Sequence, residues 1–248
     1  MPDTRPNLFY SAILANYPVT CVFTGKPVSY GGPSGLPQQH WAQRHQLCQQ
    51  LGLPAEALRM PSQVHGSTIA FLEQPDWANT DAVIVDQPLQ PVACQFADCV
   101  PVVLYAPLKH VGAVIHAGWR GTAQGIVPKT VQQLVTRYNV LPKDIIAVIG
   151  PAIGKCCFEV GPEVVEALAG SLGATDQVEP CLPSSCLNGL GPQGNPKVDV
   201  KQVNALQLRN VGVTEIELMS ACTYCETDQL WSYRRGDTGR QVALLCLN

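Results

Sequence analysis

Three side chains able to bind a metal ion stand beside glycine or close to a strand end in this sequence. His65 precedes a glycine, Cys99 follows a carboxylate, and His116 begins the segment His-Ala-Gly-Trp-Arg-Gly. Two imidazoles and one thiolate suit Zn²⁺, and three protein ligands leave the fourth tetrahedral position for water or substrate. Such an ion lowers the pKa of its bound water from 15.7 to about 7. From the residues alone, a packed thiol and two hydrogen-bonded imidazoles are the alternative.

The segment that follows His116 adds a pattern suited to anions. Gly118 and Gly121 permit a tight or left-handed turn, and Thr122 is predicted to cap a helix, so that backbone N–H groups point back towards His116. Arg120 lies in this turn and could hold a phosphate or a carboxylate through two parallel hydrogen bonds. A surface salt bridge is the alternative role for Arg120.

Other charged side chains are open to a functional or a structural interpretation. Asp98 could act as a general acid or base, orient a metal ligand or bind a ribose hydroxyl. Alternatively, it is a turn carboxylate that accepts hydrogen bonds from backbone amides. The C-terminal group of Arg234, Arg235, Asp237 and Arg240 could line a phosphate or nucleotide cleft, but we favour a solvated turn.

Cysteine is frequent in this chain and histidine is scarce. Eleven cysteines are an odd number, so at least one thiol has no partner within the chain. Five histidines are too few for a blue-copper site with a separate copper cluster, which excludes a true multicopper oxidase. Cys222 and Cys225 form a CxxC pair without a second pair at zinc-finger spacing, which is a weak indication of a metal site. The adjacent Cys156 and Cys157, and the pair of Cys181 and Cys186, are weaker indications still. We predict packing thiols at these positions.

The elements that must position the site alternate between strands and helices. β-Rich runs predict strands at 19–24, 68–72, 81–85, 92–96, 102–106, 111–116, 145–149, 215–219 and 242–247. Apolar periodicity and helix-end signals predict helices at 37–51, 122–138, 162–172 and 200–211. Strands continue on both sides of a stretch rich in Gly, Pro and Ser at 173–196. We therefore expect one α+β domain over residues 1–248, with mixed sheets flanked by helices and a surface excursion at 173–196.

Composition excludes several classes of protein. With 46% hydrophobic and 14% charged residues, the 248-residue chain can bury a core. A formal charge of −3 provides no basic stripe for nucleic acid, and no apolar run is long enough for a membrane-spanning helix. The N-terminus lacks the pattern of an export signal, so we expect a cytoplasmic protein. These features do not fix the oligomeric state.

The segments that contain His65, Cys99 and His116 resemble those of the laccase-domain family, whose members are described as multicopper polyphenol oxidases and as purine nucleoside phosphorylases. The resemblance extends from about residue 60 to residue 248, with matches at 63–66, 80–82, 97–101, 116–121, 149–154, 157–161, 222–224 and 231–240. Between Ser29 and Pro37 the chain is shortened against the family. Substrate contacts that the family makes there are therefore not carried over.

The resemblance implies a layered α/β fold with mixed sheets, also likened to cysteine-hydrolase-like toxin domains, and metal binding by His65, Cys99 and His116. It also implies phosphorolysis of adenosine, inosine and methylthioadenosine, with adenosine deamination as a second activity. An open zinc position suits deamination, and Arg120 with the glycine turn suits the phosphate that phosphorolysis requires. We predict Asp98, Cys99 and Arg120 as catalytic residues, zinc as cofactor, and purine nucleoside and phosphate as partners.

Three other functions use the same residues. Cys99 could be a nucleophile with His116 or His65 as its base, which would make the protein an amide hydrolase. Some relatives in the family are described as editing peptidoglycan precursors in this way. A single copper ion in the same three ligands would make it a polyphenol oxidase. A zinc ion with four protein ligands and no exchangeable water would make it a structural zinc protein.

Overall fold

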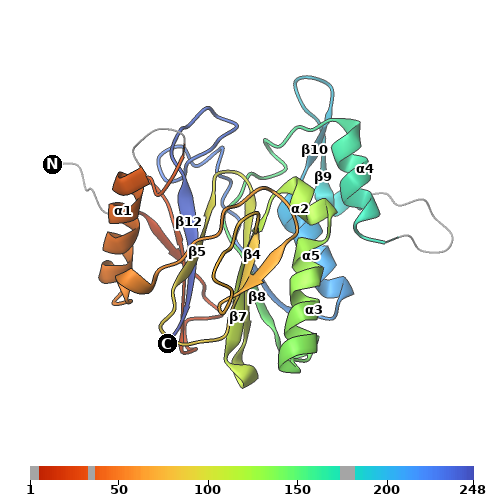
Figure 1. Cartoon of the computed structure of the whole chain (residues 1–248). Helices are drawn as coiled ribbons and strands as arrows, with labels where there is room; N and C mark the ends of the chain where they lie inside the picture. Colours follow the sequence, from red (N-terminus) through yellow and green to blue (C-terminus); the bar gives the residue numbers. More distant parts are fainter. Residues whose placement is uncertain (1–5, 33–36, 174–181) are drawn as a thin grey trace.

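The computed structural model of the chain describes residues 6–32, 37–173 and 182–248. Two sheets lie face to face (Figure 1). One helix covers the outer side of the smaller sheet, and the other helices cover the outer side of the larger sheet. This arrangement confirms the predicted layered α+β fold with mixed sheets. Within the described ranges, no helix has the length and apolar character needed to cross a membrane. The α-helices are α1 (Pro37–Gln50), α2 (Trp119–Ala123), α3 (Ile126–Tyr138), α4 (Pro162–Gly170) and α5 (Val200–Asn210).

The larger sheet has six strands among the described residues, in the order β11-β8-β6-β7-β4-β3. The central strands β6 and β7 are antiparallel, as are β6 and β8, whereas β8 with β11 and β3 with β4 form parallel pairs. Every residue of β6 and β7 is buried, because both faces of this sheet are covered. The strands are β3 (Ile69–Phe71), β4 (Ala82–Val85), β6 (Val100–Ala106), β7 (Val111–Ala117), β8 (Ile146–Ile149) and β11 (Glu215–Leu218).

The smaller sheet is antiparallel and has the order β1-β2-β12-β5 in the described part of the chain. The last strand, β12, pairs with both β2 and β5, so the C-terminal residues lie inside this sheet. The outer face of the sheet packs against α1. Its strands are β1 (Leu8–Tyr10), β2 (Val19–Thr24), β5 (Val92–Phe96) and β12 (Gln241–Leu247).

The alternation of side chains along β6 divides the core into layers. Val103 points into the space between the sheets, in one cluster with Phe23 and Leu245 of the smaller sheet. Val102 and Leu104 point to the opposite side, into the cluster that includes α3 and α5. Complete burial of an aliphatic side chain stabilises a fold by about 1.5–3 kcal/mol, and one strand thus contributes to two apolar layers. The ends of these central strands are therefore firmly placed.

The helix predicted at 122–138 is wrong at its start. The chain forms α2, then Gly125 with a φ of 72°, and then α3, so that Gly125 and not Thr122 occupies the N-cap of α3. Thr122 is buried, and its hydroxyl donates to Ala117 O at 3.3 Å and accepts from Asn204 Nδ2 at 3.1 Å. The left-handed conformation at Gly125 permits the change of direction between the two helices.

Regular structure extends into the region expected to be a surface excursion. Residues 174–181 lie outside the described ranges, but β9 (Leu187–Leu190) and β10 (Pro196–Val198) form an antiparallel hairpin after the 3₁₀ turn η4 (Ser184–Cys186). Neither these strands nor the three-residue β1 was predicted, since each is too short to establish an alternating pattern. Other 3₁₀ turns are η1 (Ala55–Ala57), η2 (Pro107–Lys109) and η3 (Pro142–Asp144).

Candidate metal centre and its cavity

Strand pairing brings the three predicted metal ligands together. Cys99 immediately precedes β6 and His116 is near the end of β7, and the register of these strands pairs Val100 with Ala117. His65 comes from the loop before β3, and its ring meets that of His116 edge to face with the centroids 4.8 Å apart. One ligand atom from each of the three residues lies within 4.8 Å of the others. This donor set fits a zinc ion with an open fourth position.

A buried carboxylate, Asp81, holds two of these ligands in place. It accepts a hydrogen bond from Nδ1 of His116 at 2.8 Å and from the backbone N–H groups of Val64, His65 and Gly66 at 3.2, 3.0 and 2.7 Å. Because an ionised carboxylate only accepts, the proton of His116 stays on Nδ1 and Nε2 is left for a metal. His65 has a φ of 63°, a region that residues other than glycine rarely adopt. The hydrogen bonds to Asp81 stabilise that turn.

The ligands perturb one another electrostatically. Burial raises the pKa of Cys99, but the charges and hydrogen bonds of His116 and His65 outweigh this effect and lower the pKa to about 6. Burial lowers the pKa of His116, but the Cys99 thiolate and Asp81 outweigh it and raise the pKa to about 9. In the absence of a metal ion, the site therefore holds a thiolate beside an imidazolium at neutral pH. Such a thiolate is ready to bind a metal.

The three ligands line a cavity of about 800 Å³. This volume is typical of small-molecule sites. The cavity combines aromatic rings, which can stack on a planar base, with guanidinium groups, which can bind an anion. These side chains are Trp119, Phe158, Tyr233, Arg120, Arg234 and Arg240.

Two glycines allow α2 to approach the metal ligands closely. A Cβ atom at Gly118 would lie 3.0 Å from Cys99 Sγ and 3.2 Å from His65 Cδ2, and one at Gly121 would lie 2.7 Å from the carbonyl oxygen of Gly66. Gly118 has a φ of −62° and Gly121 lies within α2. A left-handed turn is therefore not the reason for glycine here. The reason is the contact between α2 and the ligand loop.

Arg120 lies on the cavity wall, and its side chain is exposed. Its guanidinium stacks on the ring of Trp119, with Cζ 4.4 Å from the ring centroid. Within the described ranges, the guanidinium takes part in no salt bridge and no hydrogen bond. Its N–H groups therefore remain available to an anion in the cavity, and the alternative role, a surface salt bridge, is not seen among the described residues.

Asp98 also lines the cavity, and each of its carboxylate oxygens accepts a hydrogen bond. Oδ1 accepts from the Thr223 hydroxyl at 2.6 Å, and Oδ2 accepts from the backbone N–H of Arg234 at 2.6 Å. The backbone of Asp98 has a φ of 84°, and its carbonyl accepts from the N–H of Ile153 at 3.0 Å. These contacts join three loops at the cavity wall. They agree with the structural interpretation of Asp98, while its role as an acid or base stays a prediction.

The C-terminal arginines differ in what they contact. The guanidinium of Arg234 stacks on Phe158 at 5.1 Å and that of Arg240 lies over Tyr233 at 5.4 Å, and both arginines line the cavity. Arg235 instead donates to backbone carbonyls of the preceding loop and pairs with Asp237. The structure thus places Arg234 and Arg240 at the cavity, and Arg234 also lies in an exposed turn, as expected for a solvated segment.

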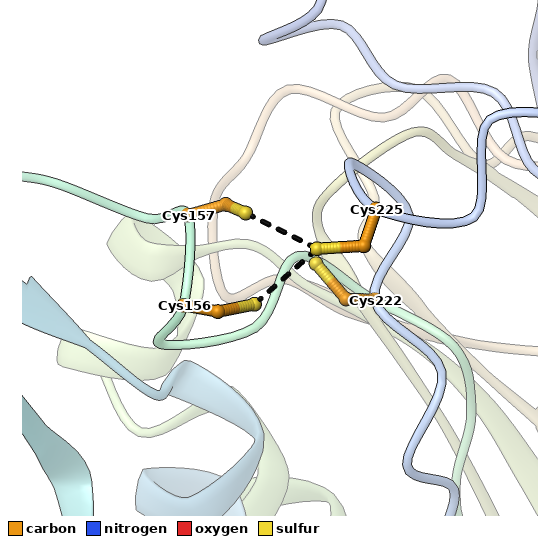
Figure 2. A group of neighbouring side chains, drawn as sticks. All are labelled: Cys156, Cys157, Cys222 and Cys225. Carbon is orange, nitrogen blue, oxygen red and sulfur yellow. Dashed lines mark hydrogen bonds between the residues drawn. The ribbon is translucent and has the colours of Figure 1, made fainter.

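Sequence reasoning missed two further features. The role of Asp81 was hidden because a carboxylate at a strand start is common, although it lies in one of the segments that resemble the family. The second feature is a cluster of four cysteines whose sulfur atoms lie within 4.8 Å of one another (Figure 2). We call it the four-cysteine cluster; its members are Cys156, Cys157, Cys222 and Cys225.

Known proteins resemble this chain over most of its length. The family model described as "Multi-copper polyphenol oxidoreductase laccase" matches residues 36–248. "Purine nucleoside phosphorylase YlmD" of Geobacillus stearothermophilus is 35% identical over 217 residues, which cover 82% of this chain and 76% of that protein. A "Purine nucleoside phosphorylase" of Haemophilus influenzae is 30% identical over 201 residues, covering 80% and 78%. The crystal structure of YlmD from Geobacillus stearothermophilus superposes with a TM-score of 0.82 at 30% identity, covering 96% of this chain and 94% of that chain.

Replacing Asp81 by asparagine should weaken zinc binding about 10- to 100-fold, because an amide cannot replace all the hydrogen bonds that orient His65 and His116. Competition with a chromogenic zinc chelator measures this affinity. Asp86→Asn is the matched control, because Asp86 follows the same strand, β4, and accepts from Tyr138 at 2.9 Å. Equal affinities in the two variants would show that Asp81 does not organise the ligands.

Zinc affinity should fall as the pH falls. Between about pH 6 and pH 9 the ion must displace the proton held by His116, so the apparent affinity should change about tenfold per pH unit. Below about pH 6 the dependence should become steeper, because Cys99 is then protonated as well. The measurement is chelator competition across this pH range at constant ionic strength. An affinity that is flat between pH 6 and pH 9 would contradict the thiolate–imidazolium pair.

Proposed function

The chain belongs to the family described as multi-copper polyphenol oxidoreductase laccase, and we propose that it acts as a zinc-dependent purine nucleoside phosphorylase. The observation that carries this proposal is one cavity in which the ligand set of His65, Cys99 and His116 lies beside arginines and aromatic rings. Relatives named purine nucleoside phosphorylase support the reaction class. Adenosine, inosine and methylthioadenosine are the proposed nucleosides, and adenosine deamination is the proposed second activity.

The donor set supports one zinc ion in this site. Two imidazoles and a thiolate of low pKa are ligands that zinc prefers, and Asp81 orients one imidazole as a carboxylate does in many zinc sites. When bound, the ion supplies a Lewis acid that stabilises negative charge developing on the substrate. A single copper ion in the same ligands is the alternative, and metal analysis of the purified protein distinguishes the two.

Arginine side chains are proposed to bind the phosphate. In phosphorolysis the bond between the sugar and the base breaks, and a phosphate oxygen bonds to the anomeric carbon. The phosphate must therefore be held next to the sugar, where its negative charge also stabilises the positive charge that develops on the ring. Arg120 is suited to this role because its guanidinium is fixed only by stacking on Trp119. Arg234 and Arg240 add positive charge on the same cavity.

Aromatic side chains of the same cavity suit the purine. Phe158 and Tyr233 are each held beside an arginine, which orients their rings at the cavity wall. Asp98 supports this wall through its hydrogen bonds to Thr223 and to the backbone of Arg234. These contacts support a positioning role for Asp98, and the second lone pair on each oxygen leaves the proposed acid or base role open to it.

One observation favours a second function. The Cys99 thiolate beside the His116 imidazolium is also the arrangement of a cysteine nucleophile and its base, which would act on amide substrates without a metal ion. A hydrolase of this kind should be blocked by alkylation of the metal-free protein. A zinc enzyme should instead lose activity on chelation and regain it when zinc is added.

With adenosine and phosphate, the zinc-loaded protein should release adenine and ribose 1-phosphate, since aromatic rings suited to a base and arginines suited to an anion line the same cavity. Chromatography of the products with and without phosphate measures this reaction, and ammonia release without phosphate reports deamination. Chelation of the metal should abolish both phosphorolysis and deamination, and added zinc should restore both reactions. Turnover of an amide substrate by metal-free protein, without any phosphate-dependent product from the three nucleosides, would favour the hydrolase.

Replacing Arg120 by glutamine should raise the KM for phosphate about 10- to 100-fold, because charge-assisted hydrogen bonds to the anion are lost. Zinc content should stay unchanged. Arg137→Gln is the control: this arginine is exposed on α3 and pairs with Glu73 at 2.6 Å, away from the cavity. Initial rates at varied phosphate measure the effect. The same KM in wild type and Arg120→Gln would remove Arg120 from phosphate binding.

A further inference from the structure

The four-cysteine cluster is formed by two loops that follow neighbouring parallel strands. Cys156 and Cys157 follow β8, and Cys222 and Cys225 follow β11. Because β8 and β11 are parallel, with Leu218 opposite Ile149, both loops leave the same edge of the sheet. The fold therefore brings together cysteines that are as many as 69 residues apart in sequence.

The spacing of the sulfur atoms suits one tetrahedral metal ion. The Sγ atom of Cys225 lies 3.6 Å from that of Cys156 and 3.4 Å from that of Cys157, and all four sulfurs lie within 4.8 Å of one another. A zinc ion with Zn–S bonds of about 2.3 Å requires sulfur atoms about 3.8 Å apart. The four side chains face one another from the two loops (Figure 2).

The backbone around the cluster is shaped for thiolate ligands. The N–H group of Gly154 donates to Cys222 Sγ at 3.2 Å, a hydrogen bond that favours the deprotonated sulfur. A Cβ atom at Gly154 would lie 3.2 Å from Cys156 Sγ, so glycine leaves room for the sulfur atoms. The N–H of Cys225 donates to the carbonyl of Cys222 at 3.1 Å, which closes the CxxC segment into a turn. This turn directs both of its thiols to the same side (Figure 2).

A buried cation lies next to the cluster. Lys201 is 2% exposed, and its ammonium group donates to the carbonyl oxygens of Met219, Ser220 and Ala221 at 2.9, 3.3 and 3.2 Å. These residues directly precede Cys222. Four thiolates around a divalent ion carry a net charge of −2, and a positive charge at this position offsets part of it.

We propose that Cys156, Cys157, Cys222 and Cys225 bind a second zinc ion, separate from the one at His65, Cys99 and His116. Four protein sulfurs close the tetrahedron, so this ion has no position for water or substrate and its role is structural. Cys156 and Cys225 are exposed, which gives the ion a route from solvent. The second ion would fasten the loop after β8 to the loop after β11.

The loops that this ion would join also form the cavity wall. Phe158, which lines the cavity, follows the cluster cysteine Cys157, and its N–H donates to Gly154 O at 3.0 Å. Thr223, between the two cysteines of the turn, donates its hydroxyl to Asp98 at 2.6 Å. The second zinc ion would thus position cavity residues without touching the substrate.

Metal analysis tests the proposal on the full-length protein purified under reducing conditions and dialysed against zinc-free buffer. The wild type should hold two zinc ions per chain by inductively coupled plasma mass spectrometry. The Cys156→Ala/Cys225→Ala variant and the His65→Ala/His116→Ala variant should each hold one, and Cys48→Ala, which removes a buried thiol outside both sites, should hold two. Circular dichroism checks that the variants fold.

The His65→Ala/His116→Ala variant makes the test independent of the proposed function and of the folding of the cysteine variant. Loaded with cobalt, it should show the intense sulfur-to-cobalt charge-transfer bands of a tetrathiolate site, and the spectrum should disappear when Cys156 and Cys225 are also replaced. No metal in the His65→Ala/His116→Ala variant, the same zinc content in the wild type and the Cys156→Ala/Cys225→Ala variant, iron in place of zinc, or a disulfide found within the cluster by mass spectrometry would each overturn the proposal.

Discussion

The carboxylate of Asp81 is the constraint on which the candidate metal centre depends. It is fully buried at the start of β4, and there its oxygens accept hydrogen bonds from three consecutive backbone N–H groups and from the ring of His116. A buried charge without such partners would cost several kcal/mol, so the loop that carries His65 must wrap around this carboxylate. The hydrogen bonds that satisfy Asp81 are thus the same ones that place two metal ligands and select the free nitrogen of one of them.

The two-sheet core supplies the firm base that this carboxylate needs. β4, β6 and β7 are paired strands whose residues are all buried, so Asp81, Cys99 and His116 are held at fixed positions at or near the ends of these strands. Loops then add the groups that face the cavity. This division of roles between strands and loops agrees with a general pattern, in which a rigid scaffold positions the residues of a site and loops define what the site recognises.

Sequence patterns predicted what depends on local chemistry. The central strands, four of the helical regions and the likeness of ligand segments to a known family are all local features, and the structure bears out the layered fold and the proximity of His65, Cys99 and His116. What the sequence could not predict depends on contacts between distant segments. The N-cap at Gly125 was missed because Thr122 is a good capping residue, yet its hydroxyl is used by Asn204. Arg234 and Arg240 look like surface charges until tertiary packing places them on aromatic rings at the cavity.

The two candidate metal sites differ in the number of protein ligands that they offer and in their access to the cavity. The site of His65, Cys99 and His116 has three ligands and opens into the cavity, whereas the four-cysteine cluster has enough ligands to close its coordination shell. Adjacent peptide groups connect them: the N–H of Ile153 donates to the carbonyl of Asp98 beside the cavity, and the N–H of Gly154 donates to Cys222 in the cluster. A displacement of this loop would therefore change both groups at once. Tight coordination on one side of such a loop restricts its motion on the other side, where precise placement of substrate groups affects the rate most strongly.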